Sequence, residues 1–272
     1  MSGMLILRLI LGGAIGYAVI AFLAWLLQER LAFPGWRAAV PDPVGLGLPG
    51  ERITLTLADG TSLIGWYLSP LVPAASFPGL LWFYGNGENL GTIWPIIRDF
   101  RPPLAAVLVV DYPGYGASGG RTTEAGVHAA GAAAYQALTA RPGVDPARLY
   151  VYGRSLGTVI ATQVAATQRT AGLILESPFT SARDMARRHY AFFPSRLLRL
   201  RLDNLATIRR VHCPVLVFHG TADGLVPPEM GRRVAAAAPG PVELVLIEGA
   251  GHNDTYALGG TPYKRKLAEF VA

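Results

Sequence analysis

Cysteine and charge are both scarce in this chain. Cys213 is the only cysteine among 272 residues, so the protein can form neither an internal disulfide nor a cysteine-rich metal site. Charged residues make up 15% of the sequence and hydrophobic residues 51%, a balance that allows a large buried core. Internal repeats and low-complexity linkers are also missing. One globular domain with an N-terminal extension is therefore the simplest organisation.

The positive charge is concentrated rather than spread along the chain. The formal net charge is +6, but the basic residues do not form a stripe with interleaved aromatics, so the pattern does not indicate nucleic-acid binding. The concentrated arginines are Arg183, Arg187, Arg188, Arg196, Arg199, Arg201, Arg209 and Arg210. Such a patch suits an anionic surface such as lipid headgroups, and a solvated helix face is the alternative.

An uncharged apolar segment, Leu9–Leu27, lies near the start of the chain. At about 1.5 Å per residue a helix here would be roughly 28 Å long, which matches a hydrocarbon core of about 30 Å. Arg8 precedes the segment, Arg30 follows it, and Trp25 lies near its end, where an amphipathic ring favours the membrane interface. We predict that residues 1–30 form a single-pass membrane anchor, with the side of the globular domain left open.

A cleavable signal peptide is the alternative for this segment. The apolar run is longer than the usual core of a signal peptide, and no Ala-x-Ala cleavage site follows it, so a retained anchor is favoured. Residues 31–50 are rich in proline and glycine and are predicted to form a linker. Residues 51–272 then make up the globular domain.

Strand-like and helix-like segments alternate along this domain. Two early segments, 52–57 and 62–68, predict a hairpin around Asp59-Gly60. Short, nearly uncharged apolar runs typical of strands buried on both faces of a parallel sheet cover 79–84, 105–110, 149–152, 172–175, 215–218 and 242–247. Helical segments are predicted at 123–140, 156–167, 229–238 and 262–271. The alternation predicts an α/β fold with a mostly parallel eight-stranded sheet and helices on both faces.

One segment, residues 180–210, interrupts this alternation between two predicted strands. It is basic and aromatic, and we predict that it forms a small helical lid. Phe179, Tyr190, Phe192 and Phe193 in or beside it would favour an apolar acyl chain, although for any one of them taken alone ordinary packing is the favoured explanation.

A Gly-x-Ser-x-Gly pattern, Gly153-Arg154-Ser155-Leu156-Gly157, lies where a predicted strand meets a predicted helix. In that setting the pattern forms a sharp elbow that presents the serine, and the turn needs small residues at its two glycine positions. Ser155 is therefore the candidate nucleophile. The backbone amide of Leu156 is a candidate oxyanion donor, because a helix N-terminus favours developing negative charge.

A serine nucleophile needs a base, and the base needs an orienting acid. Asp223 lies in a turn just past one predicted strand, and His252 lies in a glycine-flanked loop after the last one. Both positions are at strand ends, where the sites of α/β proteins collect, and the order serine, acid, histidine is the one expected with this elbow. Taken singly they could be a turn former and a loop histidine. Together with Ser155 they predict a triad that requires no metal and no cofactor.

The loop Tyr84-Gly85-Asn86-Gly87-Glu88-Asn89 follows another predicted strand. Gly85 allows the backbone to approach closely, and we predict the amide of Asn86 as the second oxyanion donor. Glu88 and Asn89 are expected to begin the next helix, where acidic and polar side chains are favourable.

These segments together resemble the membrane-anchored α/β-hydrolases of the ABHD type, whose oxyanion loop reads His-Gly-Asn-x-Gly-Asn. The matching segments are 84–89, 111–118, 153–157, 175–181, the turn at Asp223, and 251–254. The chain departs from the family loop at Tyr84, which replaces its histidine, and at Glu88, which replaces its glycine.

The resemblance implies an α/β-hydrolase fold with Ser155, Asp223 and His252 as the triad and the amides of Asn86 and Leu156 as the oxyanion hole. Because the family includes lysophospholipases and acyl-protein thioesterases, it also implies a serine hydrolase that cleaves the ester or thioester of an apolar acyl group. A serine peptidase of the aminopeptidase type shares the fold, but it should need an acidic or polar site for a substrate amine. A non-catalytic, membrane-tethered binding protein is a third possibility, against which the presence of all three triad residues argues.

Overall fold

In the computed structural model, which describes residues 2–272, an eight-stranded sheet forms the centre of the domain, in the order β1-β2-β4-β3-β5-β6-β7-β8. The strands are β1 Gly50–Thr56, β2 Ser62–Leu68, β3 Phe77–Phe83, β4 Ala106–Val110, β5 Val144–Arg154, β6 Gly172–Glu176, β7 Val215–Gly220 and β8 Val242–Ile247. The β1–β2 and β2–β4 pairs are antiparallel, and all other neighbouring pairs are parallel. The predicted α/β fold with a mostly parallel sheet is confirmed.

The burial of each strand follows its place in the sheet. Strands β4, β6 and β7 are buried along their whole length, as their uninterrupted apolar runs require. The edge strands β1 and β8 are more exposed and carry charged residues, which is how natural sheets protect their free edges. The hydrophobic core therefore surrounds the central strands of the sheet.

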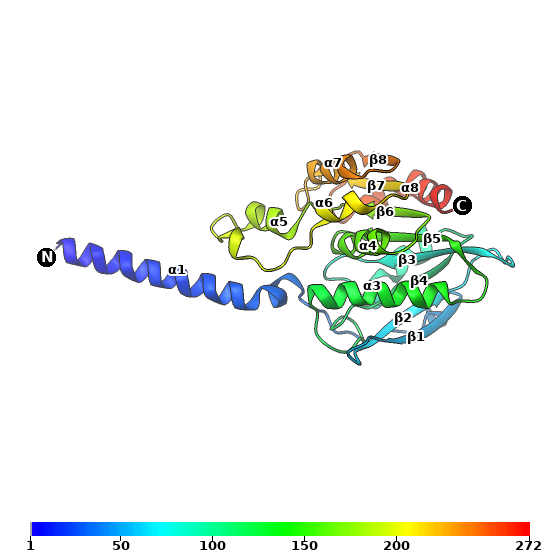
Figure 1. Ribbon diagram of the computed structural model, residues 1–272, viewed down its shortest axis with the longest axis horizontal. Coiled ribbons are helices and arrows are strands. Elements are labelled where there is room, and N and C mark those ends of the chain that lie inside the picture. The colour runs from blue at the N-terminus through cyan, green and yellow to red at the C-terminus, as the bar shows by residue number, and fades with distance from the viewer. Residues whose placement is uncertain (1) are drawn as a thin grey trace.

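Helices pack on the sheet in two groups. Helices α3 (Glu124–Thr139) and α4 (Leu156–Thr167) pack against each other and against β3 and β5. Helix α2 (Leu90–Phe100) contacts α8 (Thr255–Val271), while α7 (Pro228–Ala237) packs on β7 and β8. Figure 1 shows α3 and α4 lying in front of the sheet, with the N-terminus of α4 at the end of β5.

Helix α8 is longer than the sequence predicted. It begins at Thr255 rather than at residue 262, and its regular geometry breaks at Gly260, which has φ 46° and ψ −133°. The break explains the shorter prediction, because Gly259, Gly260 and Pro262 interrupt the helical pattern of the sequence. The first turns of α8 therefore start directly after the loop that carries His252.

The N-terminal segment forms one continuous helix, α1 (Ser2–Ala32). By length and composition, Gly3–Ala32 is the one helix among residues 2–272 that could cross a membrane, and its most apolar window is not buried in the rest of the protein. Figure 1 shows α1 extending away from the domain. The segment after it packs on the domain, because Phe33, Val40 and Leu48 are buried there.

The connection from β6 to β7 contains the segment predicted as a lid. It is built from α5 (Ala182–His189), α6 (Asn204–Thr207) and the two short helices η2 (Ser195–Leu197) and η3 (Ile208–Arg210). Figure 1 shows α5 and the loop that follows it on the same side of the molecule as α1.

Candidate active site

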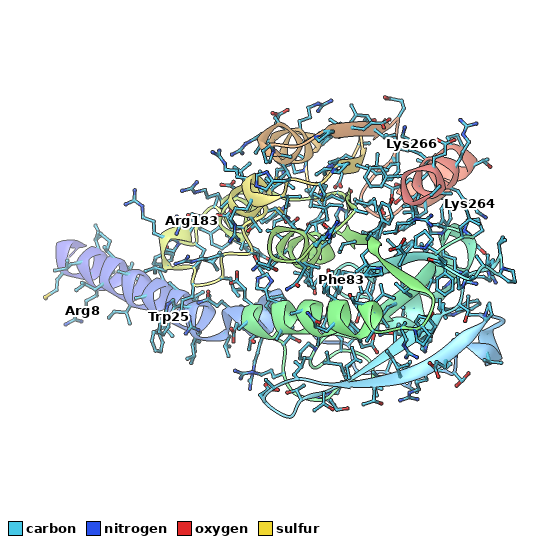
Figure 2. The ribbon with its side chains drawn as sticks, turned by 45° about the vertical axis from the view of Figure 1, so that its right-hand side comes forward. Arg8, Trp25, Phe83, Arg183, Lys264 and Lys266 are labelled. Carbon is cyan, nitrogen blue, oxygen red and sulfur yellow. The ribbon has the colours of Figure 1, made fainter. Side chains whose placement is uncertain are left out.

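The site lies at the carboxyl ends of the parallel strands. The loop after β3 carries Asn86, β5 runs into Ser155, the turn after β7 carries Asp223, and the loop after β8 carries His252. Parallel strands end at the same edge of a sheet, which is why residues far apart in the sequence meet there. Phe83, the last residue of β3, marks this edge in the interior of the molecule (Figure 2).

Ser155 occupies a strained turn between β5 and α4. Its φ of 50° and ψ of −113° lie outside the regions that side-chain-bearing residues usually adopt. A Cβ on Gly153 would lie 2.4 Å from the carbonyl oxygen of Gly157, and a Cβ on Gly157 would lie 2.1 Å from that of Phe83. Only glycine fits at both positions, so these two residues allow the elbow to close.

His252 connects Ser155 to Asp223 through hydrogen bonds on both ring nitrogens. Its Nε2 lies 3.0 Å from the Oγ of Ser155, and its Nδ1 lies 2.8 Å from the Oδ2 of Asp223. A carboxylate can only accept, so Nδ1 carries the proton in this arrangement and Nε2 is free to accept the hydroxyl proton. The side chain of Asp223 is completely buried and that of His252 is 9% exposed.

The carboxylate of Asp223 is stabilised as an anion. Its Oδ1 accepts backbone hydrogen bonds from Leu225 at 3.0 Å and Val226 at 2.8 Å. Burial acts to raise the pKa of Asp223, but the contacts with His219, His252 and the Val226 amide outweigh it and hold the pKa well below its usual range. The carboxylate beside the imidazole is therefore ionised at neutral pH.

His219, the penultimate residue of β7, also stabilises the ionised carboxylate of Asp223. Its Nε2 lies 2.8 Å from the carbonyl oxygen of Val226 and 3.5 Å from the Oδ2 of Asp223. The ring is fully buried against Gly231 of α7, where a Cβ would lie 2.2 Å from its Nδ1. The sequence analysis did not place His219 beside the carboxylate, although its spacing of four residues from Asp223 across a tight turn was an available signal.

The loop after β3 passes directly beside Ser155. A Cβ on Gly85 would lie 3.5 Å from the Cβ of Ser155. The side chain of Asn86 is held on both ends, since its Nδ2 donates to the carbonyl oxygen of Ala32 at 2.8 Å and its Oδ1 accepts from the Tyr115 hydroxyl at 2.5 Å. Its side chain is thus engaged elsewhere, and the backbone amide is the group left to serve a substrate.

Leu156 supplies the second predicted amide. It is the first residue of α4, directly after Ser155, and amides in the first turn of a helix have no acceptor within the helix. The positive end of the helix dipole lies at the same place. The structure therefore puts both predicted oxyanion donors, the amides of Asn86 and Leu156, on segments that adjoin Ser155.

Tyr84 fixes the base of this loop where related loops have histidine. Its hydroxyl donates to the Oδ1 of Asp111 at 2.9 Å, and its carbonyl oxygen accepts from the hydroxyl of Tyr112 at 2.6 Å. The same Oδ1 of Asp111 accepts from the amide of Leu90, the first residue of α2, at 2.8 Å. Both ends of the loop are therefore attached to one buried carboxylate.

Glu88 does not begin helix α2 as the sequence indicated. Asn89 is the N-cap of that helix and forms a capping box with Thr92. The carboxylate of Glu88 turns back instead and accepts from the amide of Gly85 at 2.6 Å and from Nη1 of Arg154 at 2.9 Å. The charge of the cation beside it redirected the side chain, a tertiary effect that local helix rules do not contain.

Arg154 is a functional candidate that sequence reasoning missed. Its Nη2 donates to the carbonyl oxygen of His252 and to the Oδ1 of Asn253, both at 2.8 Å, and its Nε lies 3.3 Å from the Oε1 of Glu176. Burial acts to lower the pKa of Arg154, but the carboxylates of Glu176 and Glu88 raise it above its usual range. The guanidinium of Arg154 therefore links the loop that carries His252 to the buried carboxylate of Glu176 below Ser155.

Glu176 ends β6 and is completely buried beneath the site. Its carboxylate accepts from Tyr263 at 3.0 Å, from Tyr152, and from the hydroxyl of Thr255 at the start of α8. With Arg154 these donors satisfy a charge that would otherwise be costly to bury. No group of three or more histidine, cysteine, aspartate or glutamate side chains within residues 2–272 is arranged to hold a metal ion.

Comparison with known proteins identifies the family. Residues 78–207 match the family described as the alpha/beta hydrolase fold. An uncharacterized protein of Mycobacterium tuberculosis is 36% identical over 93% of this chain and 90% of its own length. The alpha/beta hydrolase domain-containing protein 17B of Xenopus laevis is 34% identical over 74% of this chain and 68% of its own length.

Solved structures show the same fold. An esterase of Pyrococcus furiosus superposes with a TM-score of 0.68, covering 86% of this chain and 97% of the esterase at 20% identity. The predicted fold and the predicted family are both confirmed. The chain belongs to the α/β-hydrolase superfamily and is a hydrolase of the ABHD type.

Proposed function

We propose that this protein is a membrane-anchored serine hydrolase that cleaves the ester or thioester of an apolar acyl group, with Ser155, His252 and Asp223 as its catalytic triad. The observation that carries the proposal is the pair of hydrogen bonds made by His252, 3.0 Å to Ser155 and 2.8 Å to Asp223. This is the geometry in which an imidazole can accept a hydroxyl proton while a carboxylate stabilises the resulting cation.

The first step forms an acyl-enzyme. The Oγ of Ser155 attacks the carbonyl carbon while Nε2 of His252 takes its proton, and the carbonyl oxygen becomes an oxyanion. The amides of Asn86 and Leu156 donate to that oxyanion, and Asp223 stabilises the imidazolium. His252 then gives its proton to the leaving alcohol or thiol as the tetrahedral intermediate collapses.

The second step reverses the roles. Water attacks the carbonyl carbon of the acyl-enzyme while His252 removes one of its protons, and the amides again hold the oxyanion. As this intermediate collapses, His252 returns the proton to the Oγ of Ser155 and the carboxylic acid is released. The chemistry is complete with the side chains and amides of this chain.

The surroundings favour an acyl substrate over a peptide. An aminopeptidase needs a free carboxylate near the nucleophile for the substrate amine. Glu88 is the acidic residue closest in the loop to the oxyanion amides, but Arg154 and the Gly85 amide already occupy its oxygens. We therefore place the peptidase second, and the apolar residues of the lid and α1 favour a substrate drawn from the membrane.

Labelling with a fluorophosphonate probe tests the nucleophile directly. We expect the full-length protein in detergent micelles to form one adduct, located by peptide mass spectrometry on Ser155, because only an activated serine attacks the phosphorus. Protein denatured before exposure to the probe is the matched control and should not react. Folded protein without an adduct on Ser155 would instead support a non-catalytic binding protein.

Replacing Arg154 should affect both stability and catalysis. Arg154→Met leaves Glu176 without its cation, and breaking a buried pair from one side costs about 3–5 kcal/mol. At roughly 2–4 °C per kcal/mol for a domain of this size, Tm should fall by about 10 °C. Because the carbonyl of His252 also loses its donor, we expect kcat to fall roughly tenfold with KM little changed.

Arg154→Lys separates positioning from stability. Lysine keeps the charge beside Glu176 but cannot reach His252, Asn253 and both carboxylates with one planar fork. It should recover most of the lost Tm and little of the lost kcat. Equal recovery of the two quantities would show that Arg154 acts on stability alone.

A further inference from the structure

An apolar groove separates α1 from the lid. Its helix wall contains Ala18, Ala21 and Trp25, its lid wall contains Pro194 and Leu197, and its volume is about 450 Å³. Figure 2 shows Trp25 on α1 and Arg183 on the lid at the same end of the molecule, away from Lys264 and Lys266 on α8. The groove therefore lies on the face from which the membrane-spanning candidate projects.

The two walls are fastened together at both ends of the groove. At the domain end, the buried Oε1 of Gln28 accepts from the backbone amides of Arg199 at 2.6 Å and Leu200 at 3.2 Å. The guanidinium of Arg199 also lies over the Trp25 ring, 4.6 Å from its centre. At the far end, the hydroxyl of Tyr17 donates to the carbonyl oxygen of Phe192 at 2.7 Å. These bonds fix the width of the groove.

The groove is open along its length. Tyr17 and Phe22 on the helix wall are 47% and 58% exposed, and Leu197 on the lid wall is 48% exposed. Phe192 at the lid tip is 75% exposed. Such a concentration of exposed apolar surface is unfavourable in water, whereas a bilayer covers it. Because α1 is the membrane-spanning candidate, the lid tip beside it enters the same bilayer.

The charges around the groove fit this placement. The lid between residues 183 and 201 presents exposed arginines and only one acidic residue, Asp184; the arginines are Arg183, Arg187, Arg188, Arg196, Arg199 and Arg201. Arginine beside an apolar surface contacts anionic headgroups while the apolar side chains lie deeper. This arrangement orients the groove with its far end in the hydrocarbon and its domain end at the headgroups.

The domain end of the groove leads toward the proposed oxyanion loop. Trp25 lies about 10 Å along the helix from Ala32, at 1.5 Å per residue. The carbonyl oxygen of Ala32 accepts from the side chain of Asn86, whose amide is a proposed oxyanion donor. The helix that forms one wall of the groove thus ends in contact with the loop beside Ser155.

We propose that this groove is a binding site for one acyl chain of a membrane substrate, which enters sideways from the bilayer with its carbonyl directed to Ser155. The inference rests on the proposed acyl hydrolase function. It adds the route by which the substrate enters and a preference for substrates with a long acyl chain. A second transmembrane helix is a poorer occupant. It is about 10 Å wide with its side chains, and the lid closes the groove on one side.

Filling the groove tests the proposal. Ala18→Trp and Ala21→Trp place indoles inside it, and Ile20→Trp is the matched control, because Ile20 is 67% exposed and does not line the groove. The full-length variants in phosphatidylcholine vesicles are assayed with the p-nitrophenyl esters of palmitate and butyrate. We expect kcat/KM for palmitate to fall at least about tenfold in the two groove variants and less than twofold in the control. Butyrate should change less than twofold throughout.

Palmitate hydrolysis by Ala21→Trp at the wild-type rate would overturn the groove while leaving the hydrolase intact. A readout independent of turnover uses the same vesicles with a phosphatidylcholine carrying a diazirine on its acyl chain. Photolysis should give adducts within residues 17–25 and 192–197 that are lost in Ala21→Trp and kept in Ile20→Trp. Adducts that persist in Ala21→Trp, or crosslinks between two copies of α1 in their place, would contradict the proposal. Failure of the proposed function appears separately, as lipid adducts without cleavage of either ester.

Discussion

Ser155→Ala should lower kcat for a short-chain ester by at least about ten-thousandfold and leave KM nearly unchanged. The variant keeps the amides of Asn86 and Leu156 and the lid, but it has no side-chain atom at position 155 that can attack the carbonyl. His252 retains only its bond to Asp223. The residual rate should therefore be the small contribution of transition-state stabilisation by the oxyanion donors and binding.

The stability of this variant should be close to that of the wild type. The Ser155 side chain makes one hydrogen bond, to His252, and its removal neither opens a buried cavity nor leaves a buried charge. We expect Tm in detergent to change by no more than about 2 °C, which separates loss of chemistry from loss of fold. Ser76→Ala, at an exposed loop serine, is the matched control. Substantial turnover by purified Ser155→Ala would refute Ser155 as the nucleophile.

The fold could be predicted because its signals are local. Uninterrupted apolar runs mark the buried strands, and the elbow glycines occur where a strand meets a helix. The beginning of β5 at Val144 and of α8 at Thr255 could not be read in the same way. The first part of β5 contains Asp145, Pro146 and Arg148, and α8 is interrupted at Gly260, so tertiary pairing and packing decide both boundaries.

The residues of the candidate site also fall into those that local motifs predict and those that only tertiary contacts reveal. Ser155, Asp223 and His252 could be proposed from the order and context of short motifs, and the structure brings these three side chains into hydrogen-bonding distance. Arg154 and Glu176 could not, because their roles depend on a contact between the ends of β5 and β6 and the loop after β8. A charged residue inside Gly-x-Ser-x-Gly gives no indication of the carboxylate that it will meet.

For the N-terminal helix, the sequence predicts the apolar span and the structure adds its contacts with the rest of the protein. Composition alone predicts an apolar span, but only the structure shows that its last residue, Ala32, accepts from Asn86 and that Gln28 holds the lid. The N-terminal helix therefore forms part of the wall around the proposed site. In the proposed membrane-anchored hydrolase, these contacts hold the site close to the end of the anchor.

Asp223→Asn should lower kcat by about a thousandfold to ten-thousandfold. An amide in this position is neutral, so it cannot stabilise the imidazolium that forms when Ser155 gives up its proton. It can also donate to Nδ1 of His252 and so favour the tautomer whose Nε2 carries the proton and cannot act as a base. Asp184→Asn, at a carboxylate of the lid, is the matched control and should retain activity on a soluble ester within about twofold. A fall of less than tenfold in Asp223→Asn would contradict the proposed triad.

The stabilising effect of Asp223, measured against Asp223→Asn, should depend on pH. The pKa of Asp223 in the folded protein is held below its usual range, so its stabilising effect is complete above the unfolded-state value of about 4 and is lost as the pH falls below it. The difference in Tm between the wild type and Asp223→Asn should therefore be largest above about pH 5 and should shrink steadily toward pH 3. Other buried carboxylates titrate in both proteins and cancel in the difference. Thermal unfolding in detergent at a series of pH values measures it, and a difference that grew on acidification would show that Asp223 is protonated in the native state.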